Sequence, residues 1–112
     1  MGLINNSGLN SDRLRMTKIL KALGNPVRFQ IFEYLAECQT CITNDIVKRT
    51  PLAQSTISQH LKVLREAGLI KGELEGPATC YCLDYEGISW FKENISQWFE
   101  SIRVNFPAEE ID

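Results

Sequence analysis

Apolar and polar positions alternate between residues 51 and 70 with the period of an α-helix. Ile57, Leu61 and Leu64 recur at intervals of four and three residues, which places them on one helical face. The opposite face carries short hydroxyls, amides and one cation: Ser55, Thr56, Ser58, Gln59 and Lys62. Gly68 follows the last periodic residue and predicts the end of the helix. The segment therefore predicts a helix with one buried face and one small polar face.

A shorter helix is predicted just upstream, over residues 44–50, with Thr43 as its N-cap, Asp45 in its first turn and Pro51 at its end. A short helix, a tight turn and a second helix with a small polar face form the pattern of a helix-turn-helix, whose second helix enters the major groove of DNA. An ordinary pair of packed antiparallel helices gives the same periodicity. The elements that follow decide between these two interpretations.

Two short alternating runs follow between residues 69 and 83, and a Glu-Gly-Pro turn at residues 75–77 separates them, which predicts a β-hairpin. A helix-turn-helix followed directly by a hairpin is a winged helix. Residues 39–42 are too short for a helix, and in a winged helix this segment is a strand beside the second strand of the hairpin. The predicted fold is mainly α with a small β-hairpin wing (α+β), in the order α-α-β-α-α-β-β-α.

Three segments resemble the ArsR/SmtB family of bacterial metalloregulatory repressors: residues 22–32, residues 55–70 and Tyr81–Leu83. The resemblance runs from about residue 20 to residue 98, and residues 55–70 carry its strongest part. It implies a dimeric winged-helix repressor that releases DNA when an effector binds. Arg28 belongs to the first of these segments, but the sequence assigns it no chemical role.

The other helices are predicted from caps and apolar spacing. The first covers residues 11–23, with Ser11 or Asp12 as its cap, and the second starts with Asn25 as N-cap and Pro26 at its first helical position. We expect each to present a core stripe: Leu14, Ile19, Leu20 and Leu23 on the first, and Val27, Ile31, Phe32, Tyr34 and Leu35 on the second.

The last helix is predicted from residue 84 to about residue 104. An apolar stripe recurs along it at spacings of three and four residues, and two aromatic residues widen it: Ile88, Phe91, Ile95, Trp98 and Ile102, with Trp90 and Phe99. This is too much aromatic surface for a terminal helix to leave in water. We expect part of it to pack on the domain and part on a second subunit, since the resemblance places the first and last helices at a dimer interface. The alternative is that the whole stripe packs within the domain.

The length of 112 residues suits one domain of ordinary globular composition. We expect a flexible N-terminal arm over residues 1–10, a single winged-helix domain over residues 11–105 and an acidic tail over residues 106–112. No apolar run approaches the roughly 20 residues of a membrane span. The N-terminus lacks the pattern of a signal peptide. A cytoplasmic protein without a membrane partner is therefore expected.

The net charge of −2 argues mildly against a nucleic-acid partner, because phosphate contacts need cations. The distribution of charge matters more than its sum. Residues 46–71 hold five cations and one acid, a local charge of +4, and the acids lie mostly at the predicted wing tip and the C-terminal end. A basic DNA-binding face on an acidic chain is consistent with this distribution.

The candidate contacts with operator DNA lie on the predicted recognition helix, which should start near Ala53, and on the helix before it. We expect Thr56, Ser58 and Gln59 to contact base edges. Gln54 and Ser55 at the start of the helix, and Lys62 one turn later, are expected to contact phosphates. Lys48 and Arg49 on the preceding helix are two further candidates for phosphate contacts. A solvated polar face is the alternative. The resemblance implies a basic wing tip, whereas this chain has Glu73 and Glu75 there, so a contact between the wing and DNA is in doubt.

The cysteines suggest a sensor. Cys80 and Cys82 alternate along a predicted strand with Tyr81 and Leu83, which are expected to face the core, so both thiols should face outward. By the same alternation Cys41 points outward from the strand of residues 39–42. If these strands pair, the three thiols lie about 5 Å apart on one face.

Three thiolates without a histidine or carboxylate favour a soft ion, and As(III) or Sb(III) takes three sulfurs without a fourth ligand. Zinc prefers four ligands, which would require Cys38 as well. The resemblance does not supply this set: the zinc ligands of the family's last helix and the C-x-C of its arsenic sensors are both missing at the matching positions. Arsenite or antimonite at Cys41, Cys80 and Cys82 is therefore the expected effector, and no cofactor is expected for DNA binding itself.

Several other functions stay open at this stage. The same thiols suit a redox or persulfide switch, or they are inert and the regulator has no effector site. A protein-binding winged helix without DNA activity is a further alternative, which the acidic wing supports. An enzyme is not expected, because no nucleophile-base set or phosphate loop is present. His60 is the only histidine, and we expect it to make a structural hydrogen bond, because no histidine or acid lies three or four positions away.

Overall fold

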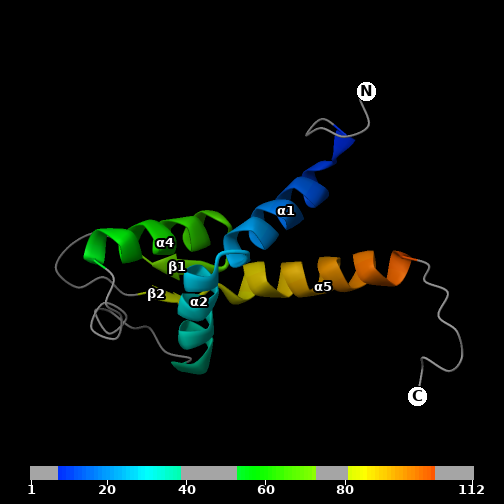
Figure 1. The fold of residues 1–112 in the computed structure, drawn as a ribbon. Helices are drawn as coiled ribbons and strands as arrows, with labels where there is room; N and C mark the ends of the chain where they lie inside the picture. Colours follow the sequence, from blue (N-terminus) through cyan, green and yellow to red (C-terminus); the bar gives the residue numbers. More distant parts are fainter. Residues whose placement is uncertain (1–7, 39–52, 73–80, 103–112) are drawn as a thin grey trace, which may run out of the picture.

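The computed structural model describes residues 8–38, 53–72 and 81–102. Within them, the chain forms α1 (Ser11–Leu23), α2 (Pro26–Cys38), α4 (Gln54–Glu66), β1 (Ile70–Gly72), β2 (Tyr81–Leu83) and α5 (Tyr85–Ser101). In Figure 1, α2, α4 and the two strands form one group, and α1 and α5 extend away from it. The predicted strand at residues 39–42, the helix at residues 44–50 and the wing turn at residues 75–77 lie outside the described residues.

The helix boundaries follow from local hydrogen bonding. Asn25 caps α2 as predicted, because its Oδ1 accepts hydrogen bonds from the backbone N–H groups of Val27 (2.9 Å) and Arg28 (3.0 Å). The predicted cap of α1 is wrong. Asn10 caps that helix, and its Oδ1 accepts from the N–H of Arg13 at 2.9 Å. Both caps use an asparagine, whose short side chain satisfies N–H groups that have no partner inside the helix.

The turn between α4 and β1 is a Schellman motif. The N–H of Leu69 donates to the carbonyl of Leu64 at 3.1 Å, and the N–H of Gly68 donates to that of Arg65 at 3.0 Å. Gly68 has φ of 82°, which a residue with a side chain rarely adopts. Leu64 and Leu69 are both buried in the same hydrophobic cluster, at the two positions whose apolar side chains often accompany this motif. Gly68 thus ends the helix as predicted and directs the chain into the sheet.

The two described strands pair antiparallel, with Ile70 opposite Leu83, Lys71 opposite Cys82 and Gly72 opposite Tyr81. Ile70, Tyr81 and Leu83 are buried. The side chains of Lys71 and Cys82 are on the other face, exposed and half-buried respectively. This confirms the predicted alternation along β2.

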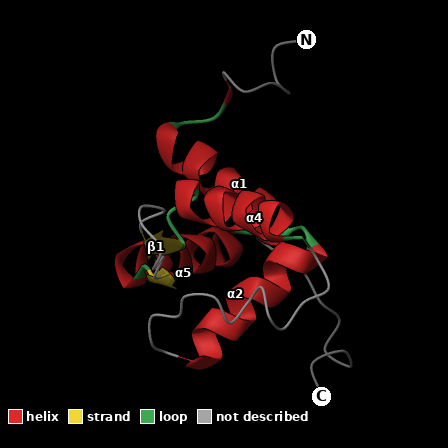
Figure 2. Ribbon diagram, turned by 90° about the vertical axis from the view of Figure 1, so that its left-hand side faces the viewer, coloured by secondary structure: helices red, strands yellow, loops and turns green. Residues whose placement is uncertain are grey.

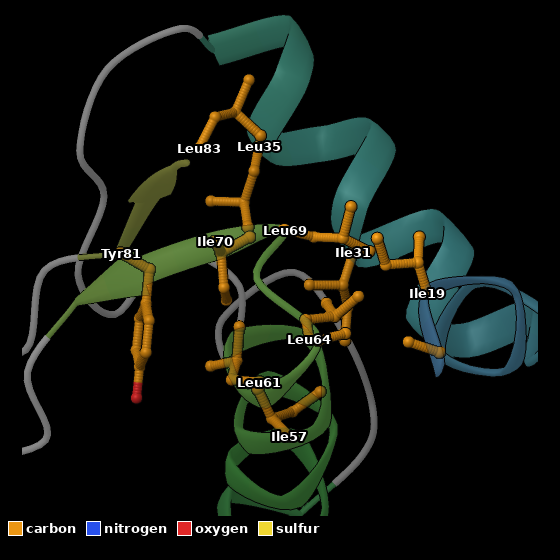
Figure 3. Close-up of a cluster of buried hydrophobic side chains, with 12 residues drawn as sticks. Ile19, Ile31, Leu35, Ile57, Leu61, Leu64, Leu69, Ile70, Tyr81 and Leu83 are labelled. Atoms are coloured by element: carbon orange, nitrogen blue, oxygen red, sulfur yellow. The ribbon is translucent and has the colours of Figure 1, made fainter. Parts of the chain in front are cut away.

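The core lies where α1, α2, α4 and the sheet meet. Buried side chains from each contribute to one cluster, of which Figure 3 labels Ile19, Ile31, Leu35, Ile57, Leu61, Leu64, Leu69, Ile70, Tyr81 and Leu83. Viewed from the side, α2 crosses below α1 and α4 (Figure 2). The predicted stripe of α2 packs here as expected, with Ile31 and Leu35 buried and Val27, Phe32 and Tyr34 packed against them.

The predicted core stripe of α1 is wrong at two positions. Leu14 and Leu20 are 40% and 46% exposed, whereas Met16, Ile19 and Ala22 are buried. Residues two apart on a helix differ by about 200° in direction, so a helix that buries Met16 and Ala22 must turn Leu14 and Leu20 away. The sequence offered apolar residues on both faces, and packing against α2 and α4 selected one of them.

Helix α5 divides its apolar stripe. Ile88, Trp90 and Phe91, in its first half, pack against the core, whereas Trp98, Phe99 and Ile102 at its other end are exposed. The guanidinium carbon of Arg15 on α1 lies 4.0 Å from the centre of the Trp90 ring, a cation–π contact that joins the two helices. In the ranges that the structure describes, no helix is long and apolar enough to cross a membrane.

Candidate nucleic-acid interface

Helix α4 has the two faces that its sequence predicts. Ile57, Leu61 and Leu64 are buried in the core. The polar face lies outside: Ser55, Thr56, Gln59 and Lys62 are exposed, and Ser58 is half-buried. Gln54 is the first residue of α4, but its side chain lies outside the described part, as do the predicted phosphate contacts Lys48 and Arg49. The structure thus brings together five of the eight predicted DNA contacts on one helix.

The N-terminus of α4 is a second feature that suits contact with DNA. Ala53 is its N-cap, and its methyl side chain makes no capping hydrogen bond. The carbonyl of Ala53 accepts from the N–H groups of Thr56 and Ile57 at 3.0 and 3.1 Å. The first N–H groups of a helix carry the positive end of its dipole and suit an anion. An exposed Ser55 hydroxyl lies beside them.

Arg28 on α2 connects three helices at the inner side of α4. Its Nε donates to the carbonyl of Ala22 at 2.8 Å, and its Nη2 donates to that of Lys21 at 3.3 Å, so the guanidinium caps the C-terminus of α1. Its Nη1 lies 3.4 Å from Nδ1 of His60. His60 therefore makes a polar contact within the protein, as its sequence context predicts. Burial, and then the positive charge of Arg28, lower the pKa of His60 below its usual value.

A second arginine joins the end of α4 to the base of the wing. Arg65 is half-buried, and its Nη1 donates to the carbonyl of Gly72 at 3.5 Å. Burial raises the pKa of the Tyr81 phenol, and the charge of Arg65 opposes that rise. Of the cations that the sequence counts near the predicted DNA face, Arg65 is therefore partly engaged by the fold, whereas Lys62 and Lys71 are exposed.

The cysteine site is described only in part. Cys82 is half-buried on the outer face of β2 and is disulfide-bonded. The side chains of Cys38, Cys41 and Cys80 lie outside the described residues. Among the residues that are described, no three histidine, cysteine, aspartate or glutamate side chains form a group that could hold a metal ion. The outward direction of Cys82 agrees with the strand argument, and the convergence of three thiols stays a prediction.

The fold and the polar helix can now be compared with known proteins. The model of the arsR family of bacterial regulatory proteins matches residues 25–71, from the cap of α2 into β1. An uncharacterised HTH-type transcriptional regulator of Methanocaldococcus jannaschii is 36% identical over 67 residues, which cover 60% of this chain and 75% of that protein. The chain belongs to the ArsR family.

Other ArsR-family relatives carry functional names. The HTH-type transcriptional repressor SmtB of Mycobacterium tuberculosis is 39% identical over 66 residues, which are 59% of this chain and 48% of that repressor. The chain thus spans about half the length of this relative. The arsenical resistance operon repressor of Staphylococcus xylosus is 28% identical over 71% of this chain and 76% of that protein. Regulators and repressors are not enzymes, in agreement with the sequence-based expectation.

Two solved structures show the same architecture. An ArsR-like transcriptional regulator from Rhodococcus sp. RHA1 superposes with a TM-score of 0.69 at 16% identity, over 81% of this chain and 85% of that one. A possible transcriptional regulator for arsenical resistance has a TM-score of 0.61 at 28% identity, over 73% and 83% of the two chains. These similarities confirm the predicted ArsR-type winged-helix fold.

Sequence reasoning missed the role of Arg28 in this ArsR-family fold. Its partner His60 is 32 positions away, so no local period links them. The available signals were one arginine in the first turn of a helix and the one histidine of the chain, which lies on another helix. Only the packing of α2 across α4 brings the two side chains together.

Proposed function

We propose that this ArsR-family protein is a repressor that binds operator DNA with the exposed face of α4. The observation that carries the proposal is that face: Thr56, Gln59 and Lys62 are exposed on a helix whose other side is fixed in the core. An α-helix is about 10–12 Å wide with its side chains and fits the major groove, which is about 12 Å wide. Hydroxyls and amides on such a helix can hydrogen-bond to base edges.

The proposed contacts divide into two kinds. Thr56, Ser58 and Gln59 read bases, and a glutamine amide matches adenine. Ser55, Gln54 and Lys62 contact phosphates, together with the first N–H groups of α4 and with Lys48 and Arg49. Phosphate contacts supply affinity that depends on salt, and base contacts supply sequence preference.

A dimer is part of the proposal, because two recognition helices must reach successive major grooves about 34 Å apart. Exposed apolar residues along α1 and at the C-terminal end of α5 support it: Leu14, Leu20, Trp98, Phe99 and Ile102. A pocket of about 310 Å³, lined by Met16 of α1 and Trp98 of α5 among polar residues of both helices, borders this surface at Trp98. Sedimentation of a Phe99→Asp variant should give monomers, whereas Ser89→Asp, at an exposed position of the same helix, should sediment like the parent protein. If both variants sediment as dimers, the result contradicts this interface.

The proposed effector is arsenite or antimonite bound by Cys41, Cys80 and Cys82. Cys82 faces outward from β2, and arsenical resistance appears in the names of two similar proteins. Binding would connect residue 41, before the helix-turn-helix, to the wing and change how α4 is held. A coupling free energy of about 1–3 kcal/mol weakens DNA binding several-fold to about a hundredfold.

The test is fluorescence anisotropy of the protein on its own upstream DNA, in a thiol-free phosphine reductant, titrated with arsenite. Cys41→Ser, Cys80→Ser and Cys82→Ser variants are measured alongside, with Cys38→Ser as the matched control. We expect release at about one arsenite per subunit, lost in the first three variants and kept in the control. Gln59→Ala should weaken operator binding about five- to a hundredfold, whereas Gln30→Ala, at an exposed position of α2, should not. A protein that binds no DNA under any of these conditions would contradict the repressor proposal.

A thiol redox switch is the second candidate, and the disulfide at Cys82 favours it. Oxidation of two thiols to a disulfide would replace metalloid binding as the event that connects the wing to another segment. The same titration separates the two. Release by peroxide or polysulfide, with no response to arsenite, would identify the redox switch.

A further inference from the structure

The contact between Arg28 and His60 is a polar link between α4, the proposed recognition helix, and the corner of α1 and α2. The guanidinium is held in place by two carbonyl oxygens at the end of α1, at 2.8 and 3.3 Å, and presents Nη1 to His60 at 3.4 Å. Both side chains are half-buried. His60 directly follows Gln59, which is exposed on the proposed DNA face, so a change at His60 acts next to a proposed base contact.

The chemistry of this contact requires a neutral imidazole. A guanidinium has only donors, so the Nδ1 of His60 must be the nitrogen without a proton, and the proton is on Nε2. A protonated His60 has no acceptor left and places a second cation 3.4 Å from Arg28. The contact therefore exists in one protonation state and is replaced by repulsion in the other.

A directional contact at this place adds to what the core determines. The buried face of α4, with Ile57, Leu61 and Leu64, fixes which side of the helix turns inward, but the hydrophobic effect that buries it is not directional. A hydrogen bond weakens steeply as its angle departs from linearity, so the Arg28–His60 contact resists rotation of α4 about its own axis. Rotation about that axis decides which side chains point into the groove.

We propose that Arg28 is a positioning residue for DNA recognition, which holds α4 in its reading orientation through neutral His60. This inference rests on the proposed DNA-binding function. It predicts that discrimination between the operator and other DNA needs the contact, whereas affinity for phosphates does not. An acidic solution that protonates His60 should therefore lower discrimination, even though the added charge favours DNA in general.

The groups around His60 allow an effect of pH on DNA discrimination to be assigned to this residue. On α2 it faces Arg28, whose guanidinium donates to carbonyl oxygens of α1, and the Lys21 side chain on α1 is exposed. On α4 itself, the positions three and four residues away are uncharged: Thr56, Ile57, Val63 and Leu64. The lowered pKa of His60 keeps it neutral at pH 7. Because the chain has one histidine, no other side chain ordinarily titrates between about pH 5.5 and 7.

The experiment measures the ratio of affinities for the operator and a scrambled duplex of equal length, at pH 7.5 and 5.5, at constant ionic strength, without arsenite. His60→Asn keeps an acceptor near the position of Nδ1 but does not titrate, and His60→Leu removes the acceptor. We expect the ratio of the parent protein to fall in acid, by about five- to tenfold once His60 is protonated. His60→Asn should keep a high ratio at both values of pH, and His60→Leu should have a low ratio at both.

Arg28 is tested through Arg28→Lys, alone and combined with His60→Leu. Arg28→Lys should lower the ratio, and adding it to His60→Leu should lower the ratio no further. Thermal melting controls for loss of fold, since Arg28 also caps α1, whereas the His60 variants leave those bonds intact. In the free protein, ¹⁵N chemical shifts should show His60 with its proton on Nε2, and Arg28→Lys should shift that tautomer balance.

The outcomes are distinct. A ratio that is unchanged in His60→Leu at pH 7.5 would overturn the inference while leaving DNA binding in place. If His60→Asn lowers the ratio as much as His60→Leu does, and Arg28→Lys leaves the ratio unchanged, then His60 contacts DNA directly and Arg28 does not position it. A parent protein that binds neither duplex would overturn the proposed function and this inference together.

Discussion

Gly87, in the first turn of α5, lies against the turn that ends α4. A Cβ added at Gly87 would lie 1.8 Å from the carbonyl oxygen of Gly68 and 2.9 Å from its carbonyl carbon. Real Cβ atoms essentially never approach other atoms within 3.0 Å, so Gly87→Ala requires the new Cβ and the Gly68 oxygen to move apart by at least 3.0 − 1.8 = 1.2 Å. Gly68 cannot move freely, because its N–H and that of Leu69 are bonded back to α4.

The sign of this substitution is decided by comparing two effects. In a helix that had free space, alanine would be more stable than glycine by at most about 1 kcal/mol. Overpacking typically costs about 1–3 kcal/mol, and a gap of about 1 Å forfeits up to half of the dispersion energy across it. That gap would open beneath Ile88, Trp90 and Phe91, which pack against the core. We expect a net loss of about 2 kcal/mol in the free energy of unfolding.

Urea denaturation at one fixed protein concentration measures the loss. Tryptophan fluorescence follows α5, which carries Trp90 and Trp98. With a slope of about 1–2 kcal/mol per molar urea, the midpoint should fall by about 1–2 M. Ser89→Ala, at an exposed position of the same helix, should raise the midpoint slightly or leave it unchanged. A Gly87→Ala midpoint equal to or above that of the parent protein would show that the close approach of α5 to Gly68 is absent in solution.

Three further predictions follow from individual contacts. Leu64→Ala removes a fully buried side chain and should cost about 3–5 kcal/mol in urea denaturation; a loss below about 1 kcal/mol would place Leu64 outside the core. Asn25→Ala removes both hydrogen bonds of the α2 cap and should cost about 1 kcal/mol, whereas Asn25→Asp should retain most of the stability. Because the pKa of His60 is lowered on folding, its contribution to stability is full above pH 6.5 and is lost as the pH falls from there through the folded pKa. The thermal melting temperature of His60→Asn should lack this dependence on pH. An identical pH profile for the variant and the parent protein would refute the assignment.

Local signals in the sequence determined much of the fold. The bounds of α1, the Asn25 cap with Pro26 at the first position of α2, and the stop at Gly68 each depend on residues within one or two turns of the chain. The alternation of buried Tyr81 and Leu83 around Cys82 is equally local. Helical and strand periods are properties of the backbone, so the pattern of side chains alone predicts which face turns inward.

The sequence-based predictions were wrong where several neighbouring residues suited the same role. Asn10, Ser11 and Asp12 are all capable N-caps, and the chain uses Asn10. Leu14 and Leu20 are as apolar as the residues that α1 buries, and the contact with α2 and α4 decided which side of the helix faces the core. On α5 the sequence predicted a division of the stripe, but only the end of the core at Ile88, Trp90 and Phe91 determined where it falls.

In the candidate site, too, some features follow from local sequence and others only from tertiary structure. The sequence by itself determined that α4 has a buried face and a polar face, because both follow from the helical period. Tertiary structure decided that Arg28 meets His60 and that Gly87 meets Gly68, contacts that span 32 and 19 positions of the chain. Such contacts depend on how whole helices cross, and the crossing is fixed by the summed packing of the core rather than by any short segment.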